Sequence, residues 1–376
     1  MRRWIERQRN IIDFTIASLI RRKGKNLSLI SVYTFVVMLL ASVIFFTGSL
    51  KKEANLVLNE SPEIIVQRQT VGRHDLIPTA YAEKLRSIRG VVSVKARLWG
   101  YYYMAGANYT LMASDDSSPE DGYIEIGRGV ARTLQIDKGD ALALRGHEGM
   151  LFNLEVSEVF SSESELVSAD LIIMSGNDFR EFFGLDSNVA TDLVLQVRNP
   201  LEVETIAGKV LKILPDTRPI VRDEIARTYD AVFDWRGGLI IVVLSMCILS
   251  FVIFAFEKAS GLSAEERREI GTLKAVGWET QDVIIMKMWE AVTVSLSAFL
   301  MGTVLAYIHV FFMSAPLFEP VLKGWSILYP EFRLTPFISL YEIMTLLFLT
   351  VVPYIVATII PSWRAAIVDP DSIMRS

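Results

Sequence analysis

Four long stretches of this chain contain no Asp, Glu, Lys or Arg, and they constrain its fold more than any other feature. They cover residues 27–50, 237–256, 291–318 and 343–363. At about 1.5 Å per helical residue, each can cross a bilayer core of about 30 Å. A hydrophobic content of 51% also agrees with lipid-facing segments. The sequence therefore predicts a polytopic α-helical membrane protein with four transmembrane helices.

Three details of these stretches affect their interpretation. The first stretch could be a cleaved signal peptide, but its apolar run is too long for one, and no small-residue cleavage motif stands out. The third is longer than a span needs and is expected to end early, near 314–316. Pro353 lies inside the fourth, where it is expected to kink the helix.

Basic residues near the span ends set the expected orientation. Residues 1–50 hold 8 Lys and Arg against 2 Asp and Glu, and the loop 257–290 carries five Lys and Arg. Because cytoplasmic loops are enriched in Lys and Arg, both termini are expected in the cytoplasm. The cytoplasmic parts are then 1–26, 257–290 and 364–376, and the extracytoplasmic parts are 51–236 and 319–342.

The first 26 residues combine apolar and basic positions. Ile5, Ile12, Ile16 and Leu19 recur near helical spacing, with Arg on other faces. This pattern predicts an amphipathic helix lying in the cytoplasmic interface of the membrane. An unstructured basic tail is the alternative.

The insertion at 51–236 is long enough to build a core of its own. Alternation predicts strands at 152–156 and 192–197, whereas 79–88, 128–134 and 201–214 have helical character. We therefore expect a large mixed α/β extracytoplasmic domain between the first and second spans, in two lobes. Its 21 Lys and Arg against 29 Asp and Glu account for the acidic total charge of −5.

Several kinds of chemistry have no motif in the sequence. There is no Walker A loop, G-x-S-x-G or H-E-x-x-H motif, and one Cys and three His leave little scope for a metal site. His309, inside the third stretch, could be a proton relay, but an interfacial position beside Tyr307 is favoured. No catalytic, cofactor-binding or metal-binding residue is predicted. Because the chain has no energy source of its own, it is expected to use one that a cytosolic partner protein supplies.

Two clusters in the insertion allow a binding role, with a simpler alternative favoured in each case. The acidic run 115–121 could bind Ca²⁺, but it lacks EF-hand spacing and is more typical of a solvated loop. The aromatic cluster 99–103 could be a ligand cage, but packed strands have the same composition more often.

The cytoplasmic segment 263–278 is the most informative part of the sequence. Ser263 and Glu266 have capping-box spacing, so a helix is expected to begin there and to end at Gly277. A second helix is expected from about Thr280. On the first helix Ile270, Leu273 and Val276 form one short apolar stripe. Such a helix suits docking into a groove on a cytosolic protein, and a surface helix resting on the membrane is equally open.

Two motifs of this chain resemble those of the MacB/FtsX/LolC-type ABC transporter permeases. The first is Glu266-Arg267-x-x-Glu269-Ile270-Gly271-x-x-Lys274-Ala275-Val276-Gly277, followed by Trp278 where a small residue is usual. The second is Pro361-x-x-Arg364-Ala365-Ala366-x-x-x-Pro370-x-x-x-Met374-Arg375, with Met374 where Leu is usual. The order of one span, a large insertion and three further spans extends the resemblance to essentially the whole chain.

The resemblance implies a dimeric permease, formed with a second copy or a paralogue, in a bacterial cytoplasmic (inner) membrane. Its energy would come from a separate cytosolic ABC ATPase dimer that holds ATP and Mg, because the residues before the first span are too few for a fused ATPase. A periplasmic adaptor is a further candidate partner, and no nucleic acid is expected. The lobes would be a membrane-proximal porter lobe, 51–105 with 185–236, and a distal lobe, 106–184.

The resemblance also assigns roles within the first motif. Ile270, Leu273 and Val276 would fill the groove of the ATPase. Glu269 and Arg267 would make polar contacts at its rim, Gly271 would permit close approach, and Gly277 would turn the chain. The candidate ATPase-coupling residues are thus Glu266, Arg267, Glu269, Ile270, Gly271, Leu273, Lys274, Ala275, Val276 and Gly277.

Three functions are compatible with such a subunit. The favoured one is efflux or membrane extraction of an amphipathic substrate, driven by mechanotransmission from the ATPase to the extracytoplasmic domain. The alternative is an FtsX-like regulator that activates an extracytoplasmic cell-wall hydrolase and transports nothing. A sensor that reports an external ligand inward is least favoured, because the cytoplasmic parts leave no room for a signalling domain.

Overall fold

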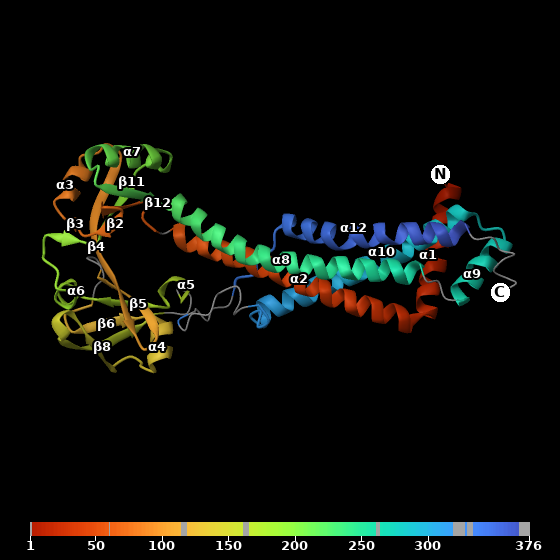
Figure 1. The fold of residues 1–376 in the computed structure, drawn as a ribbon, viewed down its shortest axis with the longest axis horizontal. Coiled ribbons are helices and arrows are strands. Elements are labelled where there is room, and N and C mark those ends of the chain that lie inside the picture. Colours follow the sequence, from red (N-terminus) through yellow and green to blue (C-terminus); the bar gives the residue numbers. More distant parts are fainter. Residues whose placement is uncertain are drawn as a thin grey trace. The chain divides into compact units, whose positions relative to one another are not determined.

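The computed structural model describes residues 2–59, 61–113, 119–160, 165–260, 264–318, 328 and 334–367. The chain divides into two compact units. Unit 1 comprises Met1–Leu50, Asp234–Phe318 and Leu334–Ser376, and unit 2 comprises Lys51–Phe233 and Glu319–Arg333. Unit 1 is helical, whereas unit 2 combines a large sheet with short helices (Figure 1).

Helices follow one another in unit 1 in the predicted order. They are α1 (Arg2–Arg21), α2 (Lys23–Asn59), α8 (Arg222–Ser260), α9 (Ala264–Ala275), α10 (Thr280–Tyr307), the π-helix η4 (Ile308–Phe312) and α12 (Leu340–Ile367). α1 confirms that the first 26 residues are mainly helical rather than an unstructured tail. α2 and α8 continue past the unit boundaries, so each belongs to both units.

Three helical segments among the described residues are long and apolar enough to cross a membrane: Lys23–Glu53, Thr280–Phe312 and Leu340–Arg364. They correspond to the first, third and fourth predicted spans. The stretch 237–256 is helical, as part of α8, but it is not one of the three, so its place in the membrane stays a prediction.

The third predicted span ends early, as expected. Its helix stops at Phe312, and Ser314 and Ala315 have positive φ angles of 60° and 48°, which a right-handed helix cannot accommodate. Pro353 lies inside α12, and so does Pro361.

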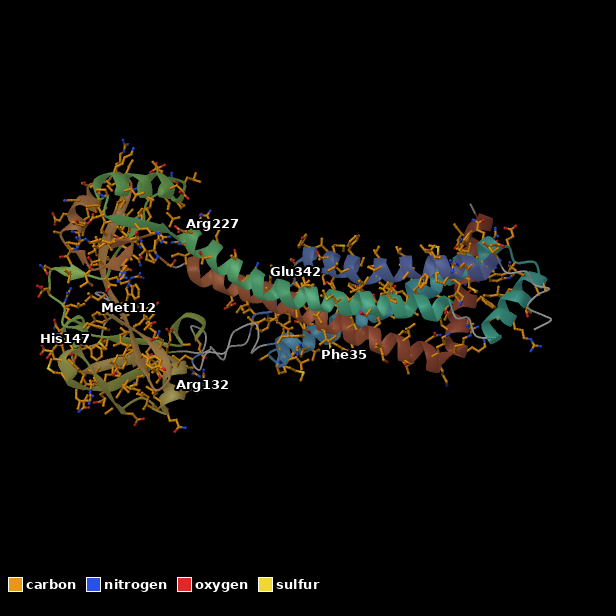
Figure 2. The ribbon with its side chains drawn as sticks, viewed as in Figure 1. Phe35, Met112, Arg132, His147, Arg227 and Glu342 are labelled. Carbon is orange, nitrogen blue, oxygen red and sulfur yellow. The ribbon has the colours of Figure 1, made fainter. Side chains whose placement is uncertain are left out.

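α2, α10 and α12 pack closely within unit 1. A Cβ atom on Gly302 of α10 would lie 2.7 Å from Cβ of Val37 and 2.9 Å from the carbonyl oxygen of Thr34, so only glycine permits this approach to α2. Tyr33 of α2 stacks on Tyr354 of α12, with ring centroids 5.3 Å apart. The outer faces are apolar: Phe35 of α2, labelled in Figure 2, is 55% exposed.

His309 is buried inside this packing. Its Nδ1 atom lies 3.0 Å from Oγ of Ser42 on α2, and its ring meets the Phe318 ring edge-on at 6.0 Å. Tyr307 instead contacts the rings of Phe311 and Phe312. The structure therefore places His309 against Ser42 and Phe318, and its expected interfacial depth in the membrane stays a prediction.

One sheet of ten strands forms the centre of unit 2. The strand order is β12-β1-β11-β4-β5-β9-β6-β8-β7, with β2 paired to β1. β5–β9 and β6–β8 are parallel, and the other pairs are antiparallel. The strands are β1 (Ile64–Thr70), β2 (Arg73–Asp75), β4 (Val91–Met104), β5 (Ala107–Ala113), β6 (Tyr123–Ile126), β7 (Ala141–Arg145), β8 (Leu151–Val159), β9 (Leu171–Met174), β11 (Asp192–Val197) and β12 (Thr217–Val221). β3 (Ile77–Pro78) and β10 (Val189–Ala190) form a separate pair.

β4 divides this sheet into two parts. Its residues up to Arg97 pair with β11, and its residues from Leu98 pair with β5. We call the strands β12, β1, β2, β11 and the start of β4 the first half-sheet, and the end of β4 with β5, β9, β6, β8 and β7 the second half-sheet. The change of partner lies a few residues before the predicted lobe boundary at 105, and the lobe assignment itself stays a prediction.

Short helices flank the two half-sheets, and several were predicted. α4 (Arg128–Leu134) and β11 have the predicted bounds, while α3 (Tyr81–Arg86) and α7 (Val203–Ile213) lie inside predicted helices. The 3-10 turn η3 (Pro200–Glu202) precedes α7, and the remaining helical pieces are α5 (Glu165–Ser168), α6 (Gly176–Phe183) and the turn η1 (His147–Gly149). The mixed α/β character of this domain is therefore confirmed.

The core of unit 2 is apolar, and a buried ionic site lies within it. Ile64, Leu195, Ile124 and Ile126 have no exposed surface. Asp192 is also fully buried, and its carboxylate accepts hydrogen bonds from Nε and Nη2 of Arg97 at 2.8 and 2.7 Å and from Nε1 of Trp99 at 2.8 Å. These three donors satisfy the charge that burial would otherwise leave unpaired.

The predicted acidic run at 115–121 lies mostly outside the described residues. Asp121 is described, and it accepts a hydrogen bond from Nδ2 of Asn177 at 3.1 Å. Within the described ranges, no group of three or more His, Cys, Asp and Glu side chains is placed to hold a metal ion.

Candidate coupling site

The two helices and the turn predicted for the segment from 263 onward are present in unit 1. α9 ends at Ala275, and Gly277 adopts a φ of 107°. The amide of Gly277 donates to the carbonyl of Lys274, and that of Trp278 to the carbonyl of Leu273, both at 3.0 Å. This glycine-terminated turn is the predicted stop. The predicted N-terminal cap, Ser263, lies outside the described residues.

α10 begins where it was predicted, at Thr280. The Glu279 side chain accepts a hydrogen bond from the backbone amide of Asp282. In return, the Asp282 carboxylate accepts a hydrogen bond from the backbone amide of Glu279 at 3.2 Å. This capping box fixes the first turn of α10 directly after the turn at Gly277.

An apolar cluster joins α9 to α1 and α10. Ile270 of α9 is 2% exposed and lies with Ile11 of α1 and Val283 of α10, which are 3% and 0% exposed. The Phe14 ring of α1 meets the Trp278 ring at 5.3 Å. Met286, Ala366, Leu273, Ile284, Ile285 and Trp289 complete this cluster.

Ion pairs reinforce the cluster from α1. Nε and Nη2 of Arg7 donate to Oδ1 and Oδ2 of Asp282, both at 2.8 Å, and Nη2 also reaches Glu279 at 3.2 Å. These hydrogen bonds, above all the one to Asp282, raise the pKa of Arg7. A bidentate pair of this kind fixes orientation as well as distance.

A second ionic contact holds Glu269 of α9. Arg21 lies 3.3 Å from its Oε1 atom, and Arg22 contacts its Oε2 atom. The side chains of Arg22 and Glu269 are each 19% exposed, so this pair is better shielded than the Arg7 pairs. We call the cluster and these ion pairs together the α1 clamp.

The predicted coupling residues do not share one outward face. Ile270 and Gly271 are buried, and Leu273 and Lys274 are partly buried, whereas Ala275, Val276 and Gly277 are exposed. Within the predicted apolar stripe, Ile270 packs inward against α1 and α10, whereas Val276 is 78% exposed. The side chains of Glu266 and Arg267 are not among those that the structure describes. The ATPase contacts assigned to these residues stay a prediction.

Sequence reasoning missed the α1 half of the site. Its predicted apolar face of Ile5 and Ile16 is 54% and 44% exposed, which suits an interface with lipid. The face toward α9 and α10 carries Arg7, Ile11 and Phe14, which also recur at helical spacing. That second stripe was readable as a packing face, but its partner lies more than 250 positions away.

A cleft of about 380 Å³ opens beside the α1 clamp. Its walls come from α1, from the turn between α9 and α10, and from the start of α10, and they carry charged, amide and aromatic groups. They are Glu6, Arg7, Asn10, Ile11, Trp278 and Asp282.

Comparison with known proteins gives one family match. Residues 237–370 match the family model described as FtsX-like permease C-terminal. A search of curated proteins finds no match.

Two solved structures are similar to parts of the chain. The extracellular domain of the noncanonic ABC-type transporter YknZ from Gram-positive bacteria is 14% identical, with a TM-score of 0.30, over 43% of this chain and 100% of that chain. The periplasmic region of MacB from Actinobacillus actinomycetemcomitans is 9% identical, with a TM-score of 0.31, over 44% of this chain and 92% of that chain.

The matched family region contains α9, α10 and α12 in full, and thus the whole coupling segment. It confirms the resemblance that the two motifs indicated. Residues 237–370 are thus similar to the C-terminal domain of FtsX-like permeases.

Proposed function

We propose that this chain is the membrane subunit of an ABC transporter, in which a separate cytosolic ATPase docks on α9 and its turn. The observation that carries the proposal is the geometry of α9 within the matched family region. Its inner face is fixed to α1 and α10, and its C-terminal end presents Val276 outward. ATP and Mg would be held by the partner, and this chain would catalyse no reaction itself.

The clamp supplies a route for force. A displacement of α9 would move α10 with it, because Ile270 and Val283 are buried in one cluster. α10 in turn touches α2 at Gly302, and α2 and α8 continue as unbroken helices into unit 2. Rigid helices in close contact transmit such displacements better than loops do. Motion of the ATPase would thus reach the extracytoplasmic domain, which is mechanotransmission.

The remaining features of the proposal follow the resemblance. The helix at 237–256 is the second of four spans, both termini are cytoplasmic, and the membrane is the bacterial inner membrane. The permease is a dimer with a second copy or a paralogue, and a periplasmic adaptor is a candidate partner. The work performed is export or membrane extraction of an amphipathic molecule.

Val276 provides the test, because its exposure separates docking from folding. Val276→Asp places a charge on the exposed end of α9 and should reduce co-purification of the ATPase from native membranes roughly tenfold or more. Leu201→Asp is the matched control, since Leu201 is 91% exposed in unit 2. Undiminished ATPase recovery with Val276→Asp would contradict docking at this end of α9.

The purified complex then distinguishes transport from regulation. In reconstituted vesicles, stimulation of ATP hydrolysis by an amphipathic molecule would support export or extraction. Dependence on an extracytoplasmic cell-wall hydrolase, without any effect of apolar molecules, would support the FtsX-like regulator instead.

A further inference from the structure

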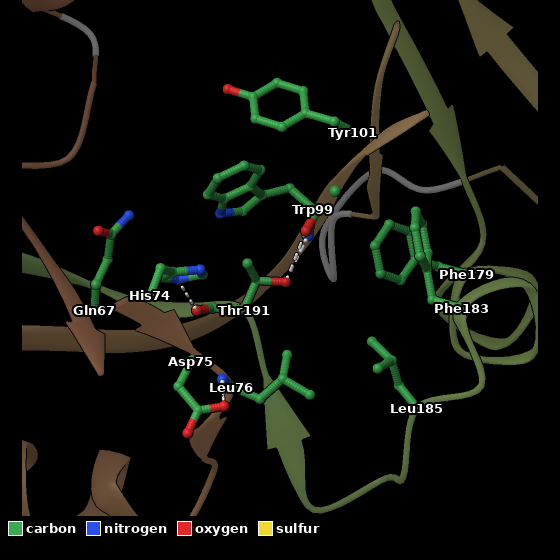
Figure 3. Close-up of a pocket in the computed structure, with 11 residues that line it drawn as sticks. Gln67, His74, Asp75, Leu76, Trp99, Tyr101, Phe179, Phe183, Leu185 and Thr191 are labelled. Carbon is green, nitrogen blue, oxygen red and sulfur yellow. Dashed lines mark hydrogen bonds between the residues drawn. The ribbon is translucent and has the colours of Figure 1, made fainter. Parts of the chain in front are cut away.

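A pocket of about 570 Å³ lies in unit 2 where β4 changes partners. His74 and Asp75 of β2 line it from the first half-sheet, and Phe179 and Phe183 of α6 line it on the other side (Figure 3). Trp99 of β4 stands between them. This volume is within the range of about 300–1,000 Å³ that small-molecule sites occupy.

Aromatic rings dominate the walls. The Trp99 ring stacks on His74 with centroids 5.8 Å apart and meets Tyr101 edge-on at 5.5 Å. Phe179 and Phe183 pack against each other at 4.6 Å. Flat apolar surfaces on two sides favour a ligand that has a flat apolar part of its own.

Hydrogen bonds hold one wall in place without a ligand. The amide of Trp99 donates to Oγ1 of Thr191 at 3.0 Å, and that hydroxyl donates to the carbonyl of Trp99 at 2.9 Å. Nε2 of His74 donates to the carbonyl of Thr191 at 3.0 Å. A wall fixed in this way loses little conformational freedom when it binds a ligand.

The pocket's carboxylate already has partners of its own. Asp75 accepts hydrogen bonds from the Thr70 hydroxyl and the Leu76 amide, both at 2.8 Å, and lies 3.7 Å from Arg68. The Thr70 hydrogen bond is the main cause that lowers the pKa of Asp75, and the carboxylate is ionised at neutral pH. A cationic ligand would therefore compete with these partners.

Two hydrogen-bonding groups of the pocket remain for a ligand. Among the described residues, no hydrogen bond joins a partner to the Gln67 side-chain amide or to Nδ1 of His74, and both residues line the pocket. We propose that this pocket binds an uncharged small molecule that combines an aromatic or other flat apolar ring with a hydrogen-bonding group.

Such a ligand would contact both half-sheets at once, so its binding would oppose their relative movement. The proposal that this ligand is the transported substrate rests on the proposed transport function, and the pocket then defines the chemical class of that substrate. Binding itself needs no ATPase, so it can fail or succeed separately from coupling.

The test uses the full chain in lipid nanodiscs and 6-propionyl-2-(dimethylamino)naphthalene, an uncharged fluorescent probe with a flat ring and a carbonyl. We expect saturable fluorescence above that of empty nanodiscs. Tyr101→Ala should weaken the probe's affinity roughly fivefold, because one aromatic contact is lost. Tyr103→Ala is the matched control, since Tyr103 is exposed on the same strand but does not line the pocket.

Gln67→Leu separates a loss of binding from a loss of folding, because it removes the side-chain amide and keeps the size of the side chain. It should also weaken binding by a few fold, with an unchanged thermal unfolding curve. Absence of saturable binding, or equal affinity in wild type, Tyr101→Ala and Gln67→Leu, would overturn the proposal. So would an equal loss in Tyr101→Ala and Tyr103→Ala when Gln67→Leu has no effect.

Discussion

The buried side chains are mainly apolar in both units, but unit 1 also exposes many large apolar side chains along its long helices. In unit 2 the fully buried side chains include Ile64, Leu195 and Ile126, and exposed strand positions carry charged residues. In unit 1, Ser42 and Ser295 are fully buried, while Leu300 and Val304 are 55% and 59% exposed. Water explains the first pattern and lipid the second, since lipid tails impose no cost on exposed apolar groups.

Ion pairs also have different surroundings in the two units. Arg97–Asp192 lies inside the sheet of unit 2, with Asp192 fully buried. The α1 clamp lies next to exposed residues such as Val276, where a partner could alter it. The Arg97–Asp192 pair thus stabilises a fold, whereas the ion pairs of the α1 clamp join elements that we propose move together.

The largest expected effect comes from reversing a charge in the α1 clamp. Glu269→Arg would place three positive charges together and should reduce ATPase-coupled activity roughly tenfold or more. Combining it with Arg22→Glu restores opposite charges and should recover much of that activity. Activity of the reconstituted complex is the measurement, with thermal unfolding of each variant as the control for folding.

The double variant also separates two roles of Glu269. Recovery would show that its partner is Arg22 of the same chain, directly after α1. A folded double variant that stays inactive would show instead that Glu269 acts directly on the ATPase, as the resemblance implies.

A smaller effect, on stability alone, is expected in unit 2. Arg97→Leu leaves the buried Asp192 carboxylate with Trp99 as its remaining side-chain donor and should cost about 3–5 kcal/mol. Thermal unfolding of the full chain in nanodiscs measures the loss. Arg97→Leu combined with Asp192→Leu should recover most of it, and a single variant as stable as wild type would contradict the buried-charge argument.

The smallest effect concerns Glu125 of β6, which pairs with Glu158 of β8. Burial, and secondarily Glu158, raises the folded-state pKa of Glu125. Ionisation therefore costs stability, and this cost disappears as the pH falls below the carboxyl's unfolded pKa of about 4.3. Glu125→Gln should stabilise unit 2 by about 0.2–1 kcal/mol at pH 7 and by nothing near pH 4.

Thermal unfolding at the two pH values measures this difference. Glu155→Gln, at an exposed position of β8, is the control and should change little at either pH. A gain from Glu125→Gln that is equal at both pH values would refute its electrostatic origin.

Local signals explain what the sequence could predict. The length of the uncharged stretches predicted the positions of three helices that can span a membrane. Gly277 predicted the end of α9, because the left-handed φ that such a turn needs favours glycine. α4 and β11 were found from short-range patterns.

Non-local contacts explain what the sequence could not predict. Arg7 and Asp282 are 275 positions apart, and the local sequence around either residue does not predict that the two pair. Periodicity showed that Ile270 is apolar, but not that α1 covers it. In the same way, the alternation of β4 gives no sign that the strand changes partners at Leu98.

β4 has a consequence for the order in which the chain is synthesised. On one side its partner β5 follows after the two-residue turn Ala105–Gly106, both at positive φ. On the other side Arg97 must wait for Asp192, which is 95 positions later. During synthesis the end of β4 can therefore pair with β5 early, while the first half of the strand has no β11 to pair with until most of unit 2 has been made.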